Sequence, residues 1–394
     1  MPTDSRRPQG LERPQRPDRR HPAADAADAA YTVDTRRRPK AQPRSGGGAP
    51  PPSSPALKSG TPPPAGSGRR VRRGRVALLV VGVLLLTWLA FLIWVPLNAW
   101  SSVARVDNIP DGDRPVDTSG HNYLLVGSDS RAGLSSEQKK QLHTGSAEGK
   151  RTDSMMILHV GSNGDTLISL PRDSNVTIPS YKGSTSGKTY PNTGRQTKLN
   201  AAYAEDGPTL LVRTIEYNMG LHIDHYVEIG FAGFAKIVDA VGGVTIDIDK
   251  GFKDKYSGAD FKSGKQTLNG DQALAFVRTR HAFAASDLQR TKNQQKFLSA
   301  LAHQVATPST VLNPFKLYPT MGAGLDSLTV DKDMGLWDLA SMFWAMKGVS
   351  GGDGTSLNMP ISGSTGGNLV WDKAKVKTLV NELNNDQKVT VSSE

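Results

Sequence analysis

The segment Val76 to Val95 constrains this chain more than any other. It reads VALLVVGVLLLTWLAFLIWV and contains no charged residue over twenty positions, which is the length that a helix needs to cross a bilayer. Five arginines between residues 69 and 75 precede it, and by the positive-inside rule they hold the N-terminus in the cytoplasm. A cleaved signal peptide fits less well, because the apolar run is too long and too far from Met1. The sequence predicts a retained transmembrane helix over residues 76–97, with everything after it outside the membrane.

The positive charge of the chain lies before this helix. Residues 1–75 contain 17 Lys+Arg and six Asp+Glu, an excess that equals the net charge of +11 for the whole chain. The remaining residues are neutral overall, so the basic composition does not indicate a nucleic-acid-binding domain, and we expect no nucleic-acid partner. The tail is rich in Pro, Gly, Ser and Arg, which predicts disorder and contact with anionic lipid headgroups. The chain has no cysteine, which excludes disulfides and cysteine-bound metals.

The region outside the membrane shows strand-like and helix-like patterns in alternation, which predicts an α/β layered fold. We expect a polar stalk over residues 98–120, one domain over 121–388, a short tail over 389–394, and a long loop over 174–197. The expected strands are 123–126, 154–160, 166–170, 225–229, 244–248 and 273–277. The expected helices are one from Asn200 as its cap, then 209–218, 231–241, one from Ser286 or Asp287 to about 304, 335–347 and 372–383. A Pro/Leu/Asn connection and a Gly/Ser-rich loop separate the last three helices.

Charged residues lie at one end of each of the first three predicted strands. The acids are Asp129, Asp153 and Asp173, and the bases beside them are Arg131 and Arg172. Open α/β sheets place their ligands at such strand ends. A hard divalent cation explains why carboxylates lie beside arginines that bind phosphate, because Mg²⁺ takes one or two carboxylates and completes its shell with phosphate oxygens and water.

A second group of arginines lies between residues 275 and 295. Arg278 and Arg280 are two apart and would share one face of an extended segment, while Arg290 and Gln294 are four apart and would share one side of a helix. An arginine can fork onto phosphate oxygens through two parallel N–H bonds. Two interpretations follow from the residues alone: ordinary pairing with surface acids, or a cradle for a multiply charged phosphorylated ligand.

Several short motifs, in this order along the chain, resemble the LytR-CpsA-Psr (LCP) family. They are Gly127 to Arg131 (GSDSR), Arg151 to Ser154 (RTDS), Leu170 to Asp173 (LPRD), Lys198 to Tyr203 (KLNAAY), Asp224 to Tyr226 (DHY), Val241 to Val244 (VGGV), Val277 to His281 (VRTRH) and Asp287 to Arg290 (DLQR). The resemblance covers residues 121 to 388 and implies α-β-α layers around a central mixed sheet. It implies an enzyme that transfers an undecaprenyl-pyrophosphate-linked glycopolymer to a muramic-acid hydroxyl of peptidoglycan, forming a phosphodiester bond. Teichoic-acid-like, arabinogalactan and capsular polymers all fit.

The resemblance also implies roles for single residues and a lipid pocket. Asp129 and Asp153 would hold Mg²⁺ or Mn²⁺, although the insertion Ala132 to Lys150 lengthens their spacing relative to the family pattern. Substrate binding falls to Arg131, Arg172, Lys198, Arg278, Arg280, Arg290 and Gln294, and the catalytic set is Arg172, Arg278, Arg280 and Asp173. Asp173 has two alternatives, a base or supporting group and a simple partner of Arg172. Two further functions stay open: a lipid pyrophosphatase with water as acceptor, and a non-catalytic lipid-carrier-binding or regulatory protein.

Other polar and apolar residues have simpler interpretations. His281 is expected to be a solvated loop histidine, and neither His222 nor His225 shows spacing to a third zinc ligand. Two apolar stripes fit either a core or a lipid pocket, and they are Leu210, Leu211 and Ile215 in one helix and Phe234, Ile237 and Val238 in the next.

Overall fold

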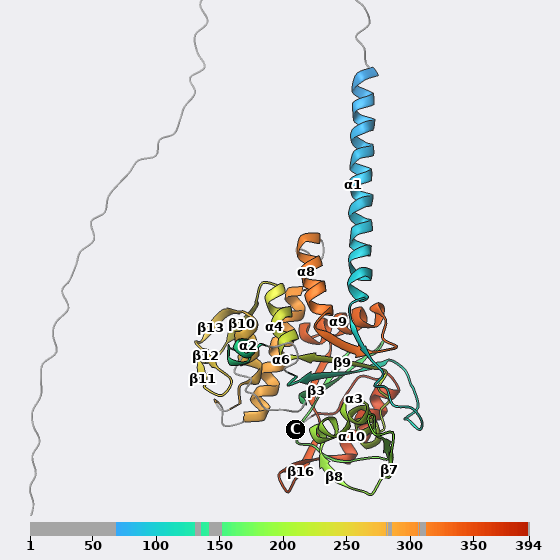
Figure 1. Ribbon diagram of the computed structural model, residues 1–394, viewed down its shortest axis with the longest axis vertical. Coiled ribbons are helices and arrows are strands. Elements are labelled where there is room, and N and C mark those ends of the chain that lie inside the picture. The colour runs from blue at the N-terminus through green and yellow to red at the C-terminus, as the bar shows by residue number, and fades with distance from the viewer. Residues whose placement is uncertain are drawn as a thin grey trace, which may run out of the picture. The chain divides into compact units, whose positions relative to one another are not determined.

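A computed structural model describes residues 68–130, 135–141, 152–280, 282, 286–305, 307 and 313–392 of the protein. Most of the basic tail lies outside these residues, as do Arg131 and His281. The first described element is α1 (Gly68–Trp100), which contains one candidate membrane span, Arg73–Trp100, whose most apolar window has a mean hydropathy of 2.9. The predicted transmembrane segment is therefore helical throughout, and the helix continues beyond the predicted end at residue 97 (Figure 1).

The domain is built on a seven-stranded sheet. In spatial order its strands are β1 (Ala104–Val106), β14 (Leu328–Asp331), β9 (His225–Gly230), β2 (His121–Ser128), β3 (Thr152–Val160), β4 (Thr166–Leu170) and β15 (Thr355–Asn358). The neighbours β1 and β14, β9 and β2, and β4 and β15 run parallel, whereas the other pairs are antiparallel. The predicted central mixed sheet is confirmed.

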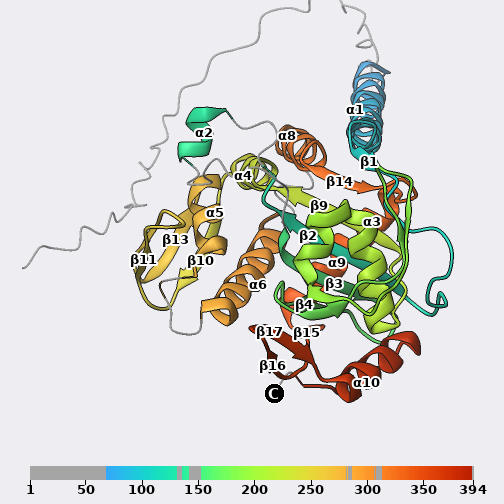
Figure 2. The same ribbon diagram turned by 60° about the horizontal axis from the view of Figure 1, so that its bottom comes forward.

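Helices cover both faces of this sheet, as the alternation within β3 requires. Met155 and Ile157 of β3 point into one core, and Met156 and Leu158 point into another on the opposite face, because successive side chains of a strand face opposite sides. The first face is covered by α3 (Leu199–Met219) and α10 (Lys373–Asn384), and the second by α6 (Ser286–Val305), α8 (Pro314–Leu325) and α9 (Leu336–Gly351) (Figures 1 and 2). This arrangement is the predicted α-β-α layering.

A satellite body lies beside the main sheet (Figure 2). It contains the antiparallel pairs β10 (Val244–Ile248) with β13 (Gly264–Leu268) and β11 (Phe252–Asp254) with β12 (Ala259–Phe261), together with α4 (Phe231–Ala240) and α5 (Gly270–Arg278). Its own core includes Phe276, whose ring centroid lies 5.8 Å from that of Phe261 and 6.1 Å from that of Phe252. The packing fixes α5, and with it the position of the arginines at its C-terminal end.

The segment 273–277 is part of helix α5, so the prediction of a strand there is wrong. Asn269 caps this helix: its side chain accepts a hydrogen bond from the Gln272 backbone at 2.9 Å, and its backbone donates to the Gln272 side chain at 3.1 Å. All five residues of 273–277 are buried. A short run that is apolar on every side carries no helical period, and periodicity alone cannot separate it from a strand.

The two helices predicted between residues 200 and 218 form one kinked element, α3. It begins at Leu199 rather than after Asn200, and Lys198 occupies the cap position. Asp206 and Gly207 interrupt it with non-helical backbone angles, and Gly207 has a φ of 73°, a conformation that glycine adopts without a steric penalty. The prediction of Asn200 as a cap is wrong, whereas the break between the two helical stretches is real.

Short elements occupy several stretches expected to be irregular. The segment predicted as a stalk contributes β1 to the sheet, and its Arg114 makes an ion pair of 2.6 Å with Glu216, so it packs on the domain. The predicted loop 174–197 holds β5 (Asn175–Thr177), β6 (Tyr181–Lys182), β7 (Thr189–Tyr190) and β8 (Gln196–Lys198). The insertion contains α2 (Ser136–Gln141), α8 replaces the predicted connection, and the Gly/Ser-rich loop contains β15, β16 (Ile361–Thr365) and β17 (Asn368–Trp371). Most of these strands have only two to four residues, which is too few to show an alternation.

Candidate active site at the strand ends

A β-bulge shapes the ends of β2 and β3. Gly127 pairs with Ser154 and Ser128 pairs with Thr152, so Asp153 is the extra residue between the two pairs. A bulge of this kind redirects a side chain and strengthens the local twist. Asp129 directly follows the last pair, and the two predicted metal ligands therefore lie at adjoining strand ends.

Four of the predicted site residues form a chain of ion pairs next to this bulge. Arg172 Nη1 lies 2.6 Å from Asp153 Oδ1, and Arg172 Nε lies 3.5 Å from Asp173 Oδ2. The Lys198 ammonium donates to Asp173 Oδ1 at 2.6 Å. Burial alone would raise the pKa of Asp173, but the Lys198 hydrogen bond and the charges of Arg172 and Arg280 outweigh burial and hold this pKa below its usual range. Asp173 is therefore a carboxylate at neutral pH.

Arg278 and Arg280 are each held by a contact with the satellite body. The Arg278 guanidinium carbon lies 4.7 Å from the centre of the Phe231 ring, which begins α4. The Arg280 backbone N–H donates to Asp254 Oδ2 at 3.0 Å. Asp254 is only 3% exposed and also accepts the Tyr256 N–H. The sequence reasoning missed Asp254, because it lies at the end of the three-residue strand β11, which carries no pattern.

Helix α6 contributes Arg290 and Gln294 to the same place. Gln294 Nε2 donates to Ser154 Oγ at 2.6 Å and to the Val277 carbonyl at 3.3 Å, so this side chain joins α6 to β3 and to α5. Arg290 is 7% exposed. The predicted i, i+4 spacing therefore does bring both side chains to one site, although α5 presents Arg278 from a helix end and not from a strand.

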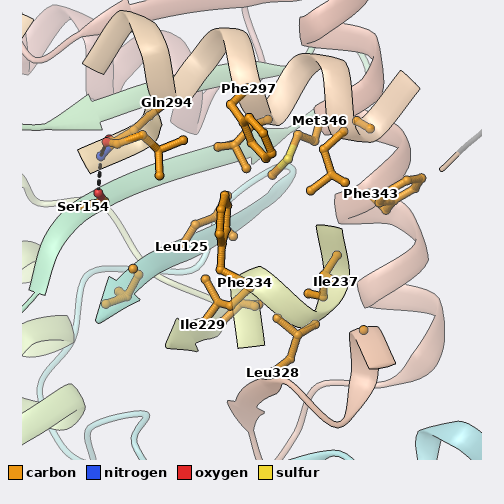
Figure 3. Close-up of a pocket in the computed structure, with 18 of the residues that line it drawn as sticks. Leu125, Ser154, Ile229, Phe234, Ile237, Gln294, Phe297, Leu328, Phe343 and Met346 are labelled. Atoms are coloured by element: carbon orange, nitrogen blue, oxygen red, sulfur yellow. Dashed lines mark hydrogen bonds between the residues drawn. The ribbon is translucent and has the colours of Figure 1, made fainter. Parts of the chain in front are cut away.

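A cavity of about 940 Å³ ends at these residues. Its polar end is lined by Asp153, Ser154, Arg278, Arg280, Arg290 and Gln294. From there an apolar arm extends between the sheet and the helices, as Figure 3 shows from the Gln294–Ser154 hydrogen bond across Phe297 to Phe343. The residues labelled along this arm are Leu125, Ile229, Phe234, Ile237, Phe297, Leu328, Phe343 and Met346.

The sequence did not decide whether its two apolar stripes form core or line a lipid pocket, and the structure contains both cases. Phe234 and Ile237 of α4 line the arm, whereas Val238 is fully buried in the satellite core. The stripe of α3 belongs to the interior on the other face of the sheet, with Leu210, Leu211 and Ile215 at most 1% exposed. The arm therefore takes one side of α4 and none of the predicted stripe of α3.

A smaller cavity of about 330 Å³ is lined in part by Arg172. It is lined by Arg172, Asp173, Lys198, Asn200, Ala201 and Ala204. The ion pair between Arg172 and Asp153 joins its lining to that of the large cavity. The predicted site residues thus fall into two connected groups, with Asp129 at the adjoining strand end and Arg131 outside the described residues.

The acidic residues fit a hard divalent cation. Asp153 uses Oδ1 for its ion pair with Arg172, while its side chain stays 43% exposed at the mouth of the polar end. Asp129 is half-buried one residue beyond the end of β2. Two carboxylates at adjoining strand ends, one of them paired with Arg172, would supply the one or two protein ligands that Mg²⁺ takes.

Glu228 is a further carboxylate near this site that the sequence did not reveal. Glu228 of β9 accepts the hydroxyl hydrogen bonds of Tyr203 and Tyr226, both at 2.8 Å. Burial, followed by the negative charge of Glu228, raises the pKa of both tyrosines well above the usual value, and the charge of Asp129 adds to the effect on Tyr203. Both hydroxyls therefore remain protonated donors, and Tyr203 lies within electrostatic range of the predicted metal ligand.

His222 has two acidic neighbours that could ligate a metal, although its spacing in the sequence did not indicate them. Ligand atoms of Asp117, His222 and Asp224 lie within 4.8 Å of one another. However, His222 Nδ1 contacts the Pro115 carbonyl at 2.9 Å, and Asp224 accepts the Asn122 N–H at 2.7 Å. Protein groups therefore already contact His222 and Asp224, and the cluster lies at the opposite end of β2 from the arginines.

Comparisons with known proteins identify the family of this chain. Residues 101–386 match the model of the LytR_cpsA_psr family. The chain is 37% identical over 326 residues to the "Probable cell wall biosynthesis protein LcpB" of Corynebacterium glutamicum, covering 81% of this chain and 75% of that protein. It is 30% identical over 276 residues to the "Polyisoprenyl-teichoic acid--peptidoglycan teichoic acid transferase TagU" of Oceanobacillus iheyensis, covering 65% and 76%.

A solved structure shares the fold. The "LytR-Csp2A-Psr enzyme from Actinomyces oris" superposes with a TM-score of 0.54 at 23% identity, over 72% of this chain and 96% of that one. The family model spans most of the described domain, and the strand-end site lies within the matched residues. The chain belongs to the LytR-CpsA-Psr family.

Proposed function

We propose that this protein is a membrane-anchored phosphotransferase that attaches a polyprenyl-pyrophosphate-linked glycopolymer to peptidoglycan through a phosphodiester bond. One observation carries the proposal: a largely apolar cavity of about 940 Å³ ends at a cluster of arginines beside Asp153. Arginine clusters bind phosphate oxygens bidentately, and an apolar cavity binds the hydrocarbon. The combination fits a ligand that is a lipid at one end and a pyrophosphate at the other.

In this proposal the arginines hold the pyrophosphate while the sugar hydroxyl attacks. Arg278, Arg280 and Arg290 line the polar end, where their fixed positive charge would stabilise the negative charge that develops on the leaving phosphate. The acceptor oxygen forms a bond to the phosphorus next to the glycan, and the bond from that phosphorus to the bridging oxygen breaks. Polyprenyl phosphate leaves with the electron pair, and the hydroxyl proton is released to solvent.

Arg172 connects the donor to the acceptor side of the site. It pairs with Asp153 at the large cavity and lines the smaller cavity beside Asp173 and Lys198. The depressed pKa of Asp173 makes it a weak base, so we assign it the task of holding Arg172 and Lys198 in place. The smaller cavity then lies where an acceptor sugar can approach the phosphorus.

Asp129 and Asp153 would hold a Mg²⁺ or Mn²⁺ ion in this scheme. The ion would neutralise charge on the pyrophosphate. The names of relatives support the same substrate classes, because TagU is named for a polyisoprenyl-linked teichoic acid and a peptidoglycan acceptor. Teichoic-acid-like, arabinogalactan and capsular polymers are the donor classes to be compared.

The test uses the purified full chain in detergent, a lipid-linked glycan donor and peptidoglycan. The proposal expects transfer that depends on Mg²⁺ and disappears in Arg278→Ala. Phosphate release without transfer would instead identify a pyrophosphatase, and tight donor binding with neither product a non-catalytic carrier-binding protein. Transfer that is unchanged by EDTA would remove the metal from the scheme.

The proposed topology places the N-terminus in the cytoplasm and the domain outside the membrane. It is supported by the arginines before residue 76 and by the candidate span that follows them. A protease added outside intact spheroplasts is expected to digest the region after Asn98 and to leave the basic tail intact. Digestion of the tail with protection of the domain would reverse the assignment.

A further inference from the structure

An unusual aromatic surface lies at the far end of the apolar arm. Trp337 is 85% exposed, Trp344 is 54% exposed and Tyr318 is 48% exposed. Trp337 and Trp344 are seven residues apart in α9, which is close to two helical turns, so both lie on one side of it. The Lys347 ammonium lies 4.9 Å from the centre of the Trp344 ring. Tyr318 lies on α8, which contacts α1 as α9 does. We call Tyr318, Trp337 and Trp344 the aromatic surface.

Helix α9 is apolar on both sides. Met342 and Ala345 are buried against the sheet, whereas the two tryptophans on the other side remain exposed among the residues that the structure describes. Among its sixteen residues the charged ones are Asp338 and Lys347. Large exposed aromatic side chains are costly in water, but tryptophan and tyrosine are enriched at the boundary between lipid headgroups and acyl chains, where one part of the ring is apolar and another is polar.

The transmembrane helix ends beside this surface. Helix α1 packs on α8 and α9, and Val95 and Ala99 near its end are buried. Just after it, Ser102 Oγ donates to Asp326 Oδ1 at 2.5 Å, which ties the chain to the end of α8. Figure 1 shows α8 rising beside the last turns of α1. The aromatic surface is therefore continuous with the place where the anchor leaves the bilayer.

The cavity opens at the same place. Leu92 and Pro96 of α1 line it together with Trp337 and Trp344 of α9. The two tryptophans thus belong both to the exposed surface and to the mouth of the apolar arm. A lipid chain that entered here would pass between the anchor and α9 without crossing water.

We propose that the aromatic surface binds the headgroup layer of the outer leaflet and holds the mouth of the cavity open to the bilayer. The partner is lipid, because the surface combines interfacial aromatic residues with a lysine and adjoins the anchor. The polyprenyl chain of the donor then enters the arm laterally from the membrane. The binding of the surface to the leaflet rests on the proposed membrane anchorage. The lateral entry of the polyprenyl chain rests on the proposed lipid-linked donor.

Depth-dependent fluorescence quenching tests the surface itself. The chain has no cysteine, so single cysteines at positions 318, 337 and 344 can each carry an environment-sensitive dye in the full chain, reconstituted in nanodiscs of phosphatidylcholine and phosphatidylglycerol. Position 217 is the control, because Tyr217 is 55% exposed on α3, which covers the other face of the sheet. We expect nitroxide lipids labelled near the headgroup to quench the three positions at least about threefold more than position 217, as burial in the interface requires. Equal quenching at all four positions would overturn the inference. The same result is expected if the surface binds a protein partner instead of lipid, because the discs contain only this chain and lipid.

A charge placed in the surface tests its role in substrate entry. Tyr318 does not line the cavity, and Tyr318→Glu would be repelled by an anionic leaflet. We expect transfer from an undecaprenyl donor in the bilayer to fall by about fivefold, while turnover of a geranyl donor in detergent stays unchanged. Tyr217→Glu is the matched control and should leave both rates unchanged. Equal rates for Tyr318→Glu and Tyr217→Glu with the bilayer donor would contradict the entry route, whereas absence of transfer in every form would contradict the proposed function and leave the quenching result to decide the surface.

Discussion

The two ends of the large cavity are built in opposite ways. The polar end is assembled from the ends of separate elements, with Asp153 from a bulge in β3, Arg278 from the end of α5 and Arg290 from α6. The apolar arm is made of ordinary helix faces and strand faces, such as Phe234 of α4 and Phe297 of α6. The polar end depends on the placement of a few groups, whereas the arm depends on shape and volume. Changes at the two ends should therefore fail in different ways, and the predictions that follow use this difference.

The largest effect is expected at the polar end. Arg278→Ala removes a guanidinium that is fixed on Phe231 and aimed into the cavity, and we expect kcat/KM for transfer to fall about 100- to 1000-fold, as for the loss of one preorganised group that stabilises developing charge. The measurement is the rate of lipid-linked glycan transfer. Arg195→Ala is the control, since Arg195 forms an exposed ion pair with Glu205 and neither residue lines a cavity. A comparable loss in that variant would show that the effect is not specific to the site.

The next effect concerns the metal. Asp153→Asn keeps the shape of the bulge residue but removes the carboxylate that pairs with Arg172. We expect the Mg²⁺ concentration for half-maximal transfer to rise at least about tenfold, because even groups that only support a ligand change metal affinity by about 10- to 100-fold. Titrating Mg²⁺ at a saturating concentration of donor measures this half-maximal concentration. A variant with lower kcat but the same half-maximal Mg²⁺ concentration would restrict Asp153 to orienting Arg172.

The apolar arm should respond through donor length. Ile237→Trp fills part of the arm beside Leu328 and Phe234 (Figure 3). Excluding about two methylenes of the lipid should raise KM for an undecaprenyl donor roughly tenfold and affect a geranyl donor much less. Val116→Trp, at a position 80% exposed outside the cavity lining, is the control. If both donors lost activity equally, the arm would not be the lipid site.

The smallest effect is on stability and depends on pH. Because the folded-state pKa of Asp173 is depressed by Lys198, Arg172 and Arg280 against the effect of burial, its ion pairs stabilise the protein above the unfolded pKa, and that stability is lost as pH falls through the folded value. Asp173→Asn should lower Tm by about 2–4 °C near neutral pH, which corresponds to about 1 kcal/mol for a domain of this size. The difference should vanish in acid below about pH 3.

Thermal unfolding from neutral to acidic pH measures this difference. Asp260→Asn removes a carboxylate from an exposed pair with Lys253 and serves as the control for the loss of one negative charge. A Tm difference for Asp173→Asn that grew toward acidic pH would show that the carboxylate is not stabilised by these partners.

The same contrast explains what the sequence could predict. Asp153 and Arg172 were predictable because charged residues stand out at the ends of apolar strands and recur in family motifs. The arm was not, because Phe234 and Ile237 on its lining and Val238 in the core are the same kinds of residue within five positions of one helix. Which side of α4 faces a cavity is decided by the distant elements packed around it.

Local sequence patterns also gave the wrong secondary structure where tertiary packing determines whether a segment is a helix or a strand. The run 273–277 became helical because Asn269 and Gln272 form a capping box and because the run is buried on every side. Asp254 gained its place beside Arg280 only through the packing of the satellite body. The mixed sheet and the alternation of strands and helices were predictable, since they follow from longer periodic segments.

A structure of the full chain with an undecaprenyl-pyrophosphate-linked disaccharide tests the central claim most directly. The account predicts phosphate oxygens within hydrogen-bond distance of Arg278, Arg280 and Arg290, with the polyprenyl chain passing Phe297 toward Phe343. A donor whose phosphates lay in the smaller cavity beside Lys198, with its lipid outside the apolar arm, would contradict it.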